Sequence, residues 1–552
     1  MDIRRTVIMI GLAISSYFLI LAWNEDYGSE KQIDAPIAAV EDTAVDTPVI
    51  TDSVSNNGNA ELPQVEVMDA PDHTAAVASG KLIRVVTDVL DISIDPRGGE
   101  VTQVLLPAYP ASIEQKDVPF VLMERNQRRV YVAQSGLLGR DGTDSNGAPL
   151  FSSSETRYEL VDGQDELKVV LSTDVEKGRI EKIYTFRRSD YLMDITYRIH
   201  NDSDTNWQGV FYAQLKRDGS ADPSSGPDMG MQAYLGAALT TQENRYEKVT
   251  FSDLEDASFK SQQNGGWAAM LQHYFLSAWV PDQDAAHTYN GRYVKGHYIF
   301  GFYDKPLQVA SGATGETGAS LYVGPKIQSQ LGEIATNLEL TVDYGWLWWI
   351  AQPLFVGLEF FHSIVGNWGV AIILLTICIK ALFFYPSAMS YRSMANMRKV
   401  GPKMQELKDR HGDNREKLGQ EMMKLYRDEK INPLGGCLPI LIQMPVFIAL
   451  YWVLMESVEL RQAPFALWIE DMSVMDPYFI LPLIMGASMF VQMKLNPAPP
   501  DPMQARVMQF MPVIFTIFFL WFPAGLVLYW VVNNLLSISQ QYVITKQIEK
   551  GA

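Results

Sequence analysis

Five apolar runs in the last third of the chain constrain its fold more than any other feature. Each run has 16 to 22 residues, and the runs cover residues 364–385, 438–455, 478–493, 507–522 and 525–544. A helix of about 20 apolar residues crosses the roughly 30 Å hydrocarbon core of a bilayer. The runs therefore predict five transmembrane helices in this part of the chain.

A sixth apolar run lies at the start of the sequence. Residues 6–23 carry no charge and follow Arg4 and Arg5. The run is long for a signal-peptide core, and no small-residue cleavage site separates it from the acidic residues that follow. We interpret residues 1–23 as an N-terminal transmembrane anchor, with a removed signal peptide as the alternative. In either case the basic flank stays in the cytoplasm and the next stretch crosses the membrane.

The charges of the loops predict how the six spans are oriented. Residues 387–433 contain 11 Lys and Arg against 7 Asp and Glu, whereas residues 456–477 contain 5 acids and one cation, Arg461. Lys and Arg concentrate in cytoplasmic loops. The signs alternate as six spans require, so we expect both termini in the cytoplasm and the large region after the first span outside.

The segment that follows the first span is acidic. Residues 24–80 carry 12 Asp and Glu, and Lys31 is the only Lys or Arg among them. They show no sustained periodicity, so they predict a disordered acidic linker. The net charge of the whole chain is −19, which argues against direct binding of nucleic acid because phosphate contacts need a basic surface.

Residues 81–340 have the pattern of an all-β domain. Short runs of alternating apolar residues, such as 166–172, 182–188 and 191–200, are separated by Gly, Asp and Asn. Such spacing predicts an antiparallel sandwich. The region contains neither cysteine and no HExxH, GxSxG, phosphate-loop or metal-spaced motif. We therefore predict a domain for stability or docking, no enzyme activity, and no metal or cofactor.

An aromatic segment joins this domain to the second span. Tyr344, Trp346, Trp348 and Trp349 fall within six residues, and apolar residues follow at helical spacing. Trp and Tyr favour the membrane interface. Residues 341–363 are therefore predicted to form an amphipathic helix on the outer membrane surface.

Lys380 is the only charged residue within the five C-terminal spans, apart from Lys494 at an edge. An ammonium at bilayer depth costs about 3 kcal/mol on insertion scales. The side chain could extend to the membrane surface near Pro386, or it could face a water-filled pocket inside the helices. Polar residues of the spans that could line such a pocket are Thr376, Gln443, Ser488, Gln492, Asn533 and Asn534. No Asp or Glu lies in these spans, which argues against a proton-driven pump.

The basic loop at residues 387–433 is predicted to be a helical hairpin. Gly412 breaks the pattern, and Asp413 with Glu416 resembles a capping box at the start of the second helix. Methionines recur along both helices, at Met394, Met397, Met404, Met422 and Met423. They could pack against each other, or they could offer client proteins a soft, adaptable surface.

Several long motifs resemble the YidC/Oxa family of membrane protein insertases, in the Gram-negative form with a large periplasmic domain. In the C-terminal part they are NPLGGCLP at 432–439, QMPVF at 443–447, SVELRQAPFALW at 457–468, FMPVIF at 510–515 and FLWFPAGLVLY at 519–529. In the outer region they are TDVLD at 87–91, RGG at 97–99, QSGL at 134–137 and VDYGWLW at 342–348.

This resemblance implies a polytopic α-helical membrane protein of six transmembrane helices, with a periplasmic β-supersandwich, in the bacterial inner membrane. Residues 364–548 would form a five-helix insertase core around a hydrophilic groove. The resemblance places Lys380 in that groove, where many relatives carry Arg, and the bidentate contact of Arg would be lost. It also adds Tyr529 and Trp530 to the groove, Trp530 standing where similar relatives often have a second Tyr.

The function implied is insertion and folding of inner-membrane proteins, alone or with the Sec translocon. The implied partners are nascent membrane proteins, the Sec translocon with its SecDF accessory part, the ribosome and the lipid bilayer. The short tail after Ile548 argues against ribosome contact through a long basic tail. Two alternatives are a small-anion transporter or channel that uses Lys380 for selectivity, and a sugar-acting enzyme suggested by fold analogy alone.

Overall fold

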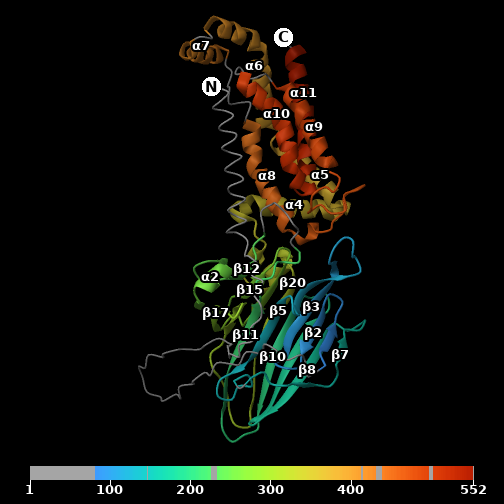
Figure 1. The fold of residues 1–552 in the computed structure, drawn as a ribbon, viewed down its shortest axis with the longest axis vertical. Helices are drawn as coiled ribbons and strands as arrows, with labels where there is room; N and C mark the ends of the chain where they lie inside the picture. The colour runs from blue at the N-terminus through green and yellow to red at the C-terminus, as the bar shows by residue number, and fades with distance from the viewer. Residues whose placement is uncertain are drawn as a thin grey trace. The chain divides into compact units, whose positions relative to one another are not determined.

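The computed structural model describes residues 81–145, 147–224, 233–411, 414–429, 438–496 and 502–550. The predictions for the anchor at 1–23 and the linker at 24–80 lie outside these residues. The described chain has a β-rich region followed by a helical region (Figure 1). This confirms the predicted division into a large β domain and a helical C-terminal part.

Two sheets make up the β domain, and their strands pair antiparallel except for β1 with β7. In spatial order, the 11-stranded sheet contains β14 (Phe259–Asn264), β17 (Ala286–Val294), β18 (His297–Tyr303), β11 (Trp207–Arg217), β5 (Val130–Leu138), β4 (Pro119–Arg125), β3 (Glu100–Pro110), β2 (Asp91–Asp95), β1 (Ile83–Val86) and β7 (Arg157–Glu159), with β19 (Leu307–Val309) beside β11. The 9-stranded sheet contains β13 (Glu247–Val249), β12 (Gly236–Leu239), β15 (Ala268–Leu271), β16 (Phe275–Val280), β20 (Thr314–Pro325), β10 (Leu192–Asn201), β9 (Gly178–Arg187), β8 (Glu166–Val175) and β6 (Ser152–Ser153).

The alternation in the sequence determines which face of each strand is buried. Along β10, buried residues alternate with half-buried ones, so Ile195, Tyr197 and Ile199 face the core. Strand β11 lies against β15, β16 and β20 of the other sheet, and most of the buried apolar residues of both sheets belong to one core. Two short helices, α2 (Phe251–Asp256) and α3 (Gln328–Ile334), supplement the strands.

A buried lysine links the two sheets. Lys182 of β9 is 1% exposed, and its Nζ donates hydrogen bonds to the carbonyl oxygens of Gly99 at 2.8 Å, Gly98 at 3.1 Å and Ser135 at 3.1 Å. Gly99 has φ +59°, and a Cβ there would lie 2.9 Å from the Lys182 side chain. The RGG and QSGL motifs therefore contribute the backbone that solvates a buried cation. Burial lowers the pKa of Lys182 to about 7.

The helical region begins with the aromatic segment. Two short 3-10 turns, η1 (Leu338–Thr341) and η2 (Gly345–Leu347), lead into α4 (Trp348–Val365), which lies across α5 and α8 (Figure 1). Gly366 ends α4 in the left-handed conformation, and Asn367 caps the next helix by accepting a hydrogen bond from the Val370 amide. The remaining helices are α5 (Trp368–Leu382), α6 (Phe384–His411), α7 (Arg415–Asp428), α8 (Leu438–Glu456), α9 (Ile480–Leu495), α10 (Pro502–Phe518) and α11 (Ala524–Lys550).

No helix within the described ranges is both long and apolar enough to qualify alone as a bilayer span. Helices α5 and α6 qualify only as a pair, and they bend by 67° where they meet. Shorter apolar helices lie at Ile442–Glu456, Ile480–Leu495 and Arg506–Trp521. The number of spans stays a prediction.

The α5–α6 bend and the hairpin differ in detail from what the sequence predicted. The bend falls at Phe383, so α5 ends at Leu382, two residues after Lys380, and Pro386 lies inside α6 instead of ending the helix of Lys380. Helices α6 and α7 confirm the two helices of the hairpin. Asn414 caps α7 by accepting a hydrogen bond from the Lys417 amide, whereas Asp413 lies outside the described residues. The predicted Asp413–Glu416 cap was therefore wrong, because the cap is one residue further on.

Buried polar contacts join the β domain to the helical region. Lys326 follows β20 and lies 3.5 Å from Glu456 at the end of α8, and these side chains are 2% and 4% exposed. His273 Nε2 lies 2.7 Å from the Met455 carbonyl oxygen. Arg461 donates to the carbonyl oxygen of Pro110 at 2.8 Å. These contacts attach the β domain to the C-terminal end of α8 and the loop after it.

We expect Lys326→Met to lower the stability of the full-length protein by about 3 kcal/mol, because it leaves the Glu456 carboxylate buried without its cation. The double variant Lys326→Met with Glu456→Leu should recover most of that loss. Thermal unfolding in detergent would compare the unsubstituted protein, each single variant and the double variant. A double variant that is as unstable as the sum of the two single variants would contradict this coupling.

His273 predicts a pH dependence of stability. Burial and the nearby Lys326 ammonium lower the pKa of His273 to about 4 from 6.5. Between these values the unfolded chain binds a proton that the folded protein does not, so stability falls as the pH falls from 6.5 towards 4. The loss approaches about 3 kcal/mol. His273→Gln should make the thermal midpoint depend less on pH between pH 7.5 and 5. An unchanged dependence on pH would count against this assignment.

Candidate functional site

Lys380 lies inside the helical region, on α5. It is 8% exposed, and its Nζ donates a hydrogen bond of 2.7 Å to Ser537 Oγ on α11. Ser537 in turn donates to the Asn533 carbonyl oxygen at 2.7 Å. The ammonium therefore points at the face of another helix and not along its own helix towards the Phe383 bend.

Helix α11 connects this lysine to two further helices. Asn533 Nδ2 donates to Gln443 Oε1 on α8 at 3.4 Å, a long hydrogen bond. Asn534 Nδ2 donates to Ser488 Oγ on α9 at 3.0 Å. Asn533, Asn534 and Ser488 are all buried. Consecutive asparagines on α11 thus reach neighbours on different sides, and the polar cluster includes residues of α5, α8, α9 and α11.

The polar stripe of α11 continues towards the hairpin. Gln541 is 2% exposed, and its Nε2 donates to Asn496 Oδ1 at 2.9 Å and to the Leu495 carbonyl oxygen at 3.2 Å, both just after or at the end of α9. Asn533, Ser537 and Gln541 are spaced by four residues and so share one face of the helix. The Tyr391 side chain of α6 also contacts the Ser537 hydroxyl.

The cluster contains one cation and no anion. Among the described residues, no carboxylate lies within 4 Å of the Lys380 ammonium. An ammonium has three N–H donors, and here one of them goes to Ser537. The Ser537 hydroxyl solvates the charge without neutralising it. The site can therefore still attract an acidic group.

Other residues predicted for the groove lie near this cluster without joining its hydrogen bonds. Thr376 is one turn before Lys380 and buried, but its hydroxyl donates to the Ile372 carbonyl oxygen at 2.6 Å. Gln492 is half-buried, and within the described part of the chain it has no hydrogen bond to the cluster. The structure thus brings together Lys380, Gln443, Ser488 and Asn533 but not these two.

Tyr529 and Trp530 form an aromatic wall one turn before Asn533. Tyr529 is 2% exposed. Trp530 packs against Phe447 with ring centroids 4.8 Å apart and against Phe519 at 5.3 Å. The buried Nε1 of Trp530 has no acceptor among the described residues. Trp530 therefore contributes apolar packing beside the polar cluster.

The sequence missed two members of the cluster, Ser537 and Gln541. Ser537 and Gln541 follow Asn533 by four and eight residues, so the sequence alone places all three on one face of a helix. Ser387 and Ser390, at the start of α6, are also buried polar residues that the sequence did not single out. Within the described ranges, no group of His, Cys, Asp and Glu could hold a metal ion.

The loop after α8 covers the N-terminal end of α5. Asn367 Nδ2 donates to the Phe465 carbonyl oxygen at 2.9 Å. A Cβ at Gly369 would lie 2.0 Å from the Phe465 ring, so only glycine allows this approach. Asp476 accepts from Trp468 Nε1 at 2.9 Å and from the Leu481 amide at 2.7 Å, which fixes the start of α9.

Most methionines of the hairpin pack internally. Met394 belongs to a buried cluster with Ala388, Tyr391 and Ile544, which attaches α6 to α11. Met404 packs with Val400, and Met397 and Met422 cover that pair between α6 and α7. Met423 is 60% exposed. The packing interpretation therefore accounts for four of these residues, and Met423 alone of the five is freely available to a partner.

These features define a helical protein with a polar, cationic cluster among apolar helices and a β domain attached at one end. The family model described as the YidC periplasmic domain matches residues 82–356, and the model described as 60Kd inner membrane protein matches residues 360–551. The chain belongs to the YidC family.

Relatives of the same length support this assignment. The membrane protein insertase YidC of Ectopseudomonas mendocina (strain ymp) is 52% identical over 580 residues, covering 100% of this chain and 99% of the relative. That of Azotobacter vinelandii (strain DJ / ATCC BAA-1303) is 53% identical over 558 residues and covers 100% of both chains.

Two solved structures are more distant. An active YidC insertase crystal structure with the first transmembrane domain resolved has a TM-score of 0.39 and 17% identity, covering 87% of this chain and 94% of the other. A galactose mutarotase related enzyme from Lactobacillus acidophilus has a TM-score of 0.30 and 11% identity, covering 44% of this chain and 97% of the other. Neither similarity supports a functional inference.

Proposed function

We propose that this protein inserts membrane proteins into the bacterial inner membrane and helps them fold. The observation that carries the proposal is the buried Lys380 ammonium, which is held by a hydroxyl and has no carboxylate within 4 Å in the described part of the chain. Its relatives over the whole length are named membrane protein insertases. They give no support to the transporter alternative, nor to a sugar-acting enzyme.

The proposed mechanism is physical. A hydrophilic segment resists crossing a bilayer because its polar groups lose their hydrogen bonds to water. The amides and hydroxyls of α8, α9 and α11 would replace part of those bonds. Lys380 would attract acidic residues of the crossing segment, and the apolar helix of the client would then move sideways into lipid. Neither a nucleotide nor a metal has a role in this mechanism.

The proposed topology has six spans, with both termini and the hairpin at 387–433 in the cytoplasm and the domain at 81–340 in the periplasm. The amphipathic helix at 341–363 would lie on the periplasmic surface. The exposed Trp346, Trp348 and Trp349 favour that placement. Nascent membrane proteins are the proposed clients, and the Sec translocon with SecDF and the ribosome are proposed partners.

The Lys380 charge predicts a specific dependence on the client. Lys380→Arg should insert acidic clients normally, Lys380→Ala should slow them about tenfold through loss of roughly 1.4 kcal/mol, and Lys380→Glu should be slowest. The measurement is insertion of one client with its outer carboxylates present or neutralised, at matched protein levels. Ser537→Ala is the control, because it removes the hydrogen bond and keeps the charge. If Lys380→Ala inserts both client forms equally well, the electrostatic role is wrong.

The hairpin is proposed to meet clients before the groove does. A photo-crosslinker at the exposed Met423 should capture a nascent client earlier in its synthesis than one at Ser488. A crosslinker at Met397, which is partly buried between α6 and α7, is the matched control and should capture less. Capture at Ser488 first would remove the hairpin from the entry route.

A further inference from the structure

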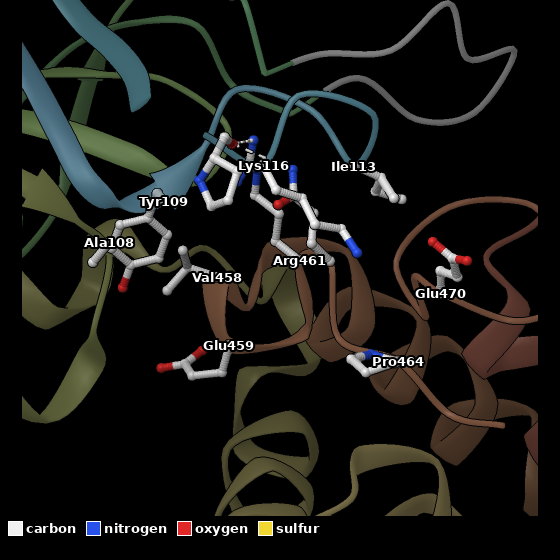
Figure 2. Close-up of a pocket in the computed structure, with 11 residues that line it drawn as sticks. Ala108, Tyr109, Ile113, Lys116, Val458, Glu459, Arg461, Pro464 and Glu470 are labelled. Atoms are coloured by element: carbon white, nitrogen blue, oxygen red, sulfur yellow. Dashed lines mark hydrogen bonds between the residues drawn. The ribbon is translucent and has the colours of Figure 1, made fainter. Parts of the chain in front are cut away.

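A pocket lies where the β domain meets the loop after α8. Its volume is about 580 Å³, within the range of roughly 300–1,000 Å³ that is usual for small-molecule sites. One wall comes from the end of β3 and the loop after it, and the other comes from residues 458–470 (Figure 2). Apolar wall residues include Tyr109, Ile113, Val458 and Pro464.

Four charged side chains line the pocket, two of each sign. They are Lys116, Arg461, Glu459 and Glu470. None of the four forms an ion pair within 4 Å with any residue of the described ranges. Figure 2 labels all four, with Glu459 on one side of the view and Glu470 on the other. The pocket therefore offers cations to an anionic group and carboxylates to a cationic group.

The backbone and neighbouring rings hold Arg461 in place before any ligand arrives. Its Nη2 donates to the carbonyl oxygens of Pro110 at 2.8 Å and Ala111 at 3.2 Å. The guanidinium also lies 5.5 Å from the Phe120 ring and 5.7 Å from the Phe275 ring. Donors that these contacts leave free can bind an anion with little loss of side-chain entropy.

Glu459 is a carboxylate that has no cationic partner within 4 Å among the described residues. Burial and, to a smaller extent, the neighbouring Glu359 of α4 raise its pKa to about 7. A ligand ammonium placed here would stabilise the ionised form. The exposed Glu470 provides a second carboxylate at the opposite side of the pocket.

The surroundings point to a lipid and not to a peptide. Leu467, three residues after the pocket residue Pro464, is 89% exposed, and Tyr478 of the same loop is 66% exposed. Such side chains favour the bilayer surface, where the proposed topology places this loop. Strand β3 is paired with β2 up to Leu105 and with β4 at Leu106 and Pro110, so most of its length is not available for a peptide to extend.

We propose that this pocket binds the headgroup of a zwitterionic phospholipid with a primary ammonium, that is, a phosphoethanolamine headgroup of the outer leaflet. Arg461 and Lys116 would bind the phosphate, and the glutamates would accept hydrogen bonds from the ammonium. A choline headgroup has no N–H donor for these carboxylates. A glycerol headgroup leaves both glutamates without a cation. The site would tie the junction of the two regions to the membrane surface.

The test uses the full-length protein in detergent, titrated with short-chain phosphatidylethanolamine, phosphatidylcholine or phosphatidylglycerol and followed by native mass spectrometry. Phosphatidylethanolamine should bind most tightly. Lys116→Ala and Glu470→Gln should each weaken it about tenfold, as expected for one charge-assisted hydrogen bond. Both side chains are exposed, so folding should be unaffected, and an unchanged thermal midpoint without lipid would check this. The exposed Lys305→Ala and Glu243→Gln are matched controls outside the pocket.

Three results would overturn the proposal. Equal affinity for the three lipids would show that the headgroup is not recognised. Preference for phosphatidylglycerol, strengthened by Glu470→Gln, would indicate a simple anion site. Binding of soluble glycerophosphoethanolamine as tightly as the lipid would indicate a soluble ligand. Loss of binding in the pocket variants alone, for phosphatidylethanolamine alone, would support the proposal.

Discussion

The helical region depends on how one ammonium is accommodated among apolar helices. A buried cation costs free energy unless polar groups replace its water. Lys380 obtains one such group from Ser537 of α11, and the other polar groups of the cluster are amides of α8 and α11 and the Ser488 hydroxyl of α9. A carboxylate would have satisfied the charge more completely, but the charge would then be neutralised before any client arrived. The arrangement keeps the helices together and leaves the cation able to attract an acidic group.

Helix α11 is the element on which that arrangement relies. Its polar residues at intervals of four point to α5 and α8 at one level and to the end of α9 at another. Its Ile544 packs with Met394 of α6, so the same helix also positions the base of the hairpin. A change in the polar cluster can thus reach the hairpin through one rigid element.

The attachment of the β domain follows a similar principle on the other side of α8. Lys326 and Glu456 are both almost fully buried, and the His273 ring bonds the Met455 carbonyl oxygen. Removing one partner of such a buried pair destabilises the protein more than replacing both partners with apolar residues, because the remaining partner stays buried without compensation. The β domain is therefore held by specific contacts, although its sequence contains no catalytic motif. The β domain can therefore be held in a fixed position against α8 and still serve as a docking surface.

Local pattern was enough to predict the strands, the hairpin and the polar residues of the spans. The runs at 166–172, 182–188 and 191–200 correspond to β8, β9 and β10, because alternation reflects burial of one face of a strand. Errors of one to three residues occurred at the α7 cap and the α5 bend, where a side-chain hydrogen bond or neighbouring helices decide the boundary. The stripe of methionines could not reveal which of them would pack inward, since that depends on where α11 lies.

The sequence by itself determined that a lone cation sits among apolar helices, because residue type and spacing are written in the chain. Only the tertiary structure decided which groups solvate it. Ser537 is 157 residues from Lys380 in sequence, and the pair forms because α5 and α11 pack side by side. The same holds for the junction pocket. Its charges come from segments about 350 residues apart, and no local pattern could show that Lys116 and Arg461 line the same pocket. Contacts at such separation depend on how whole helices and sheets pack.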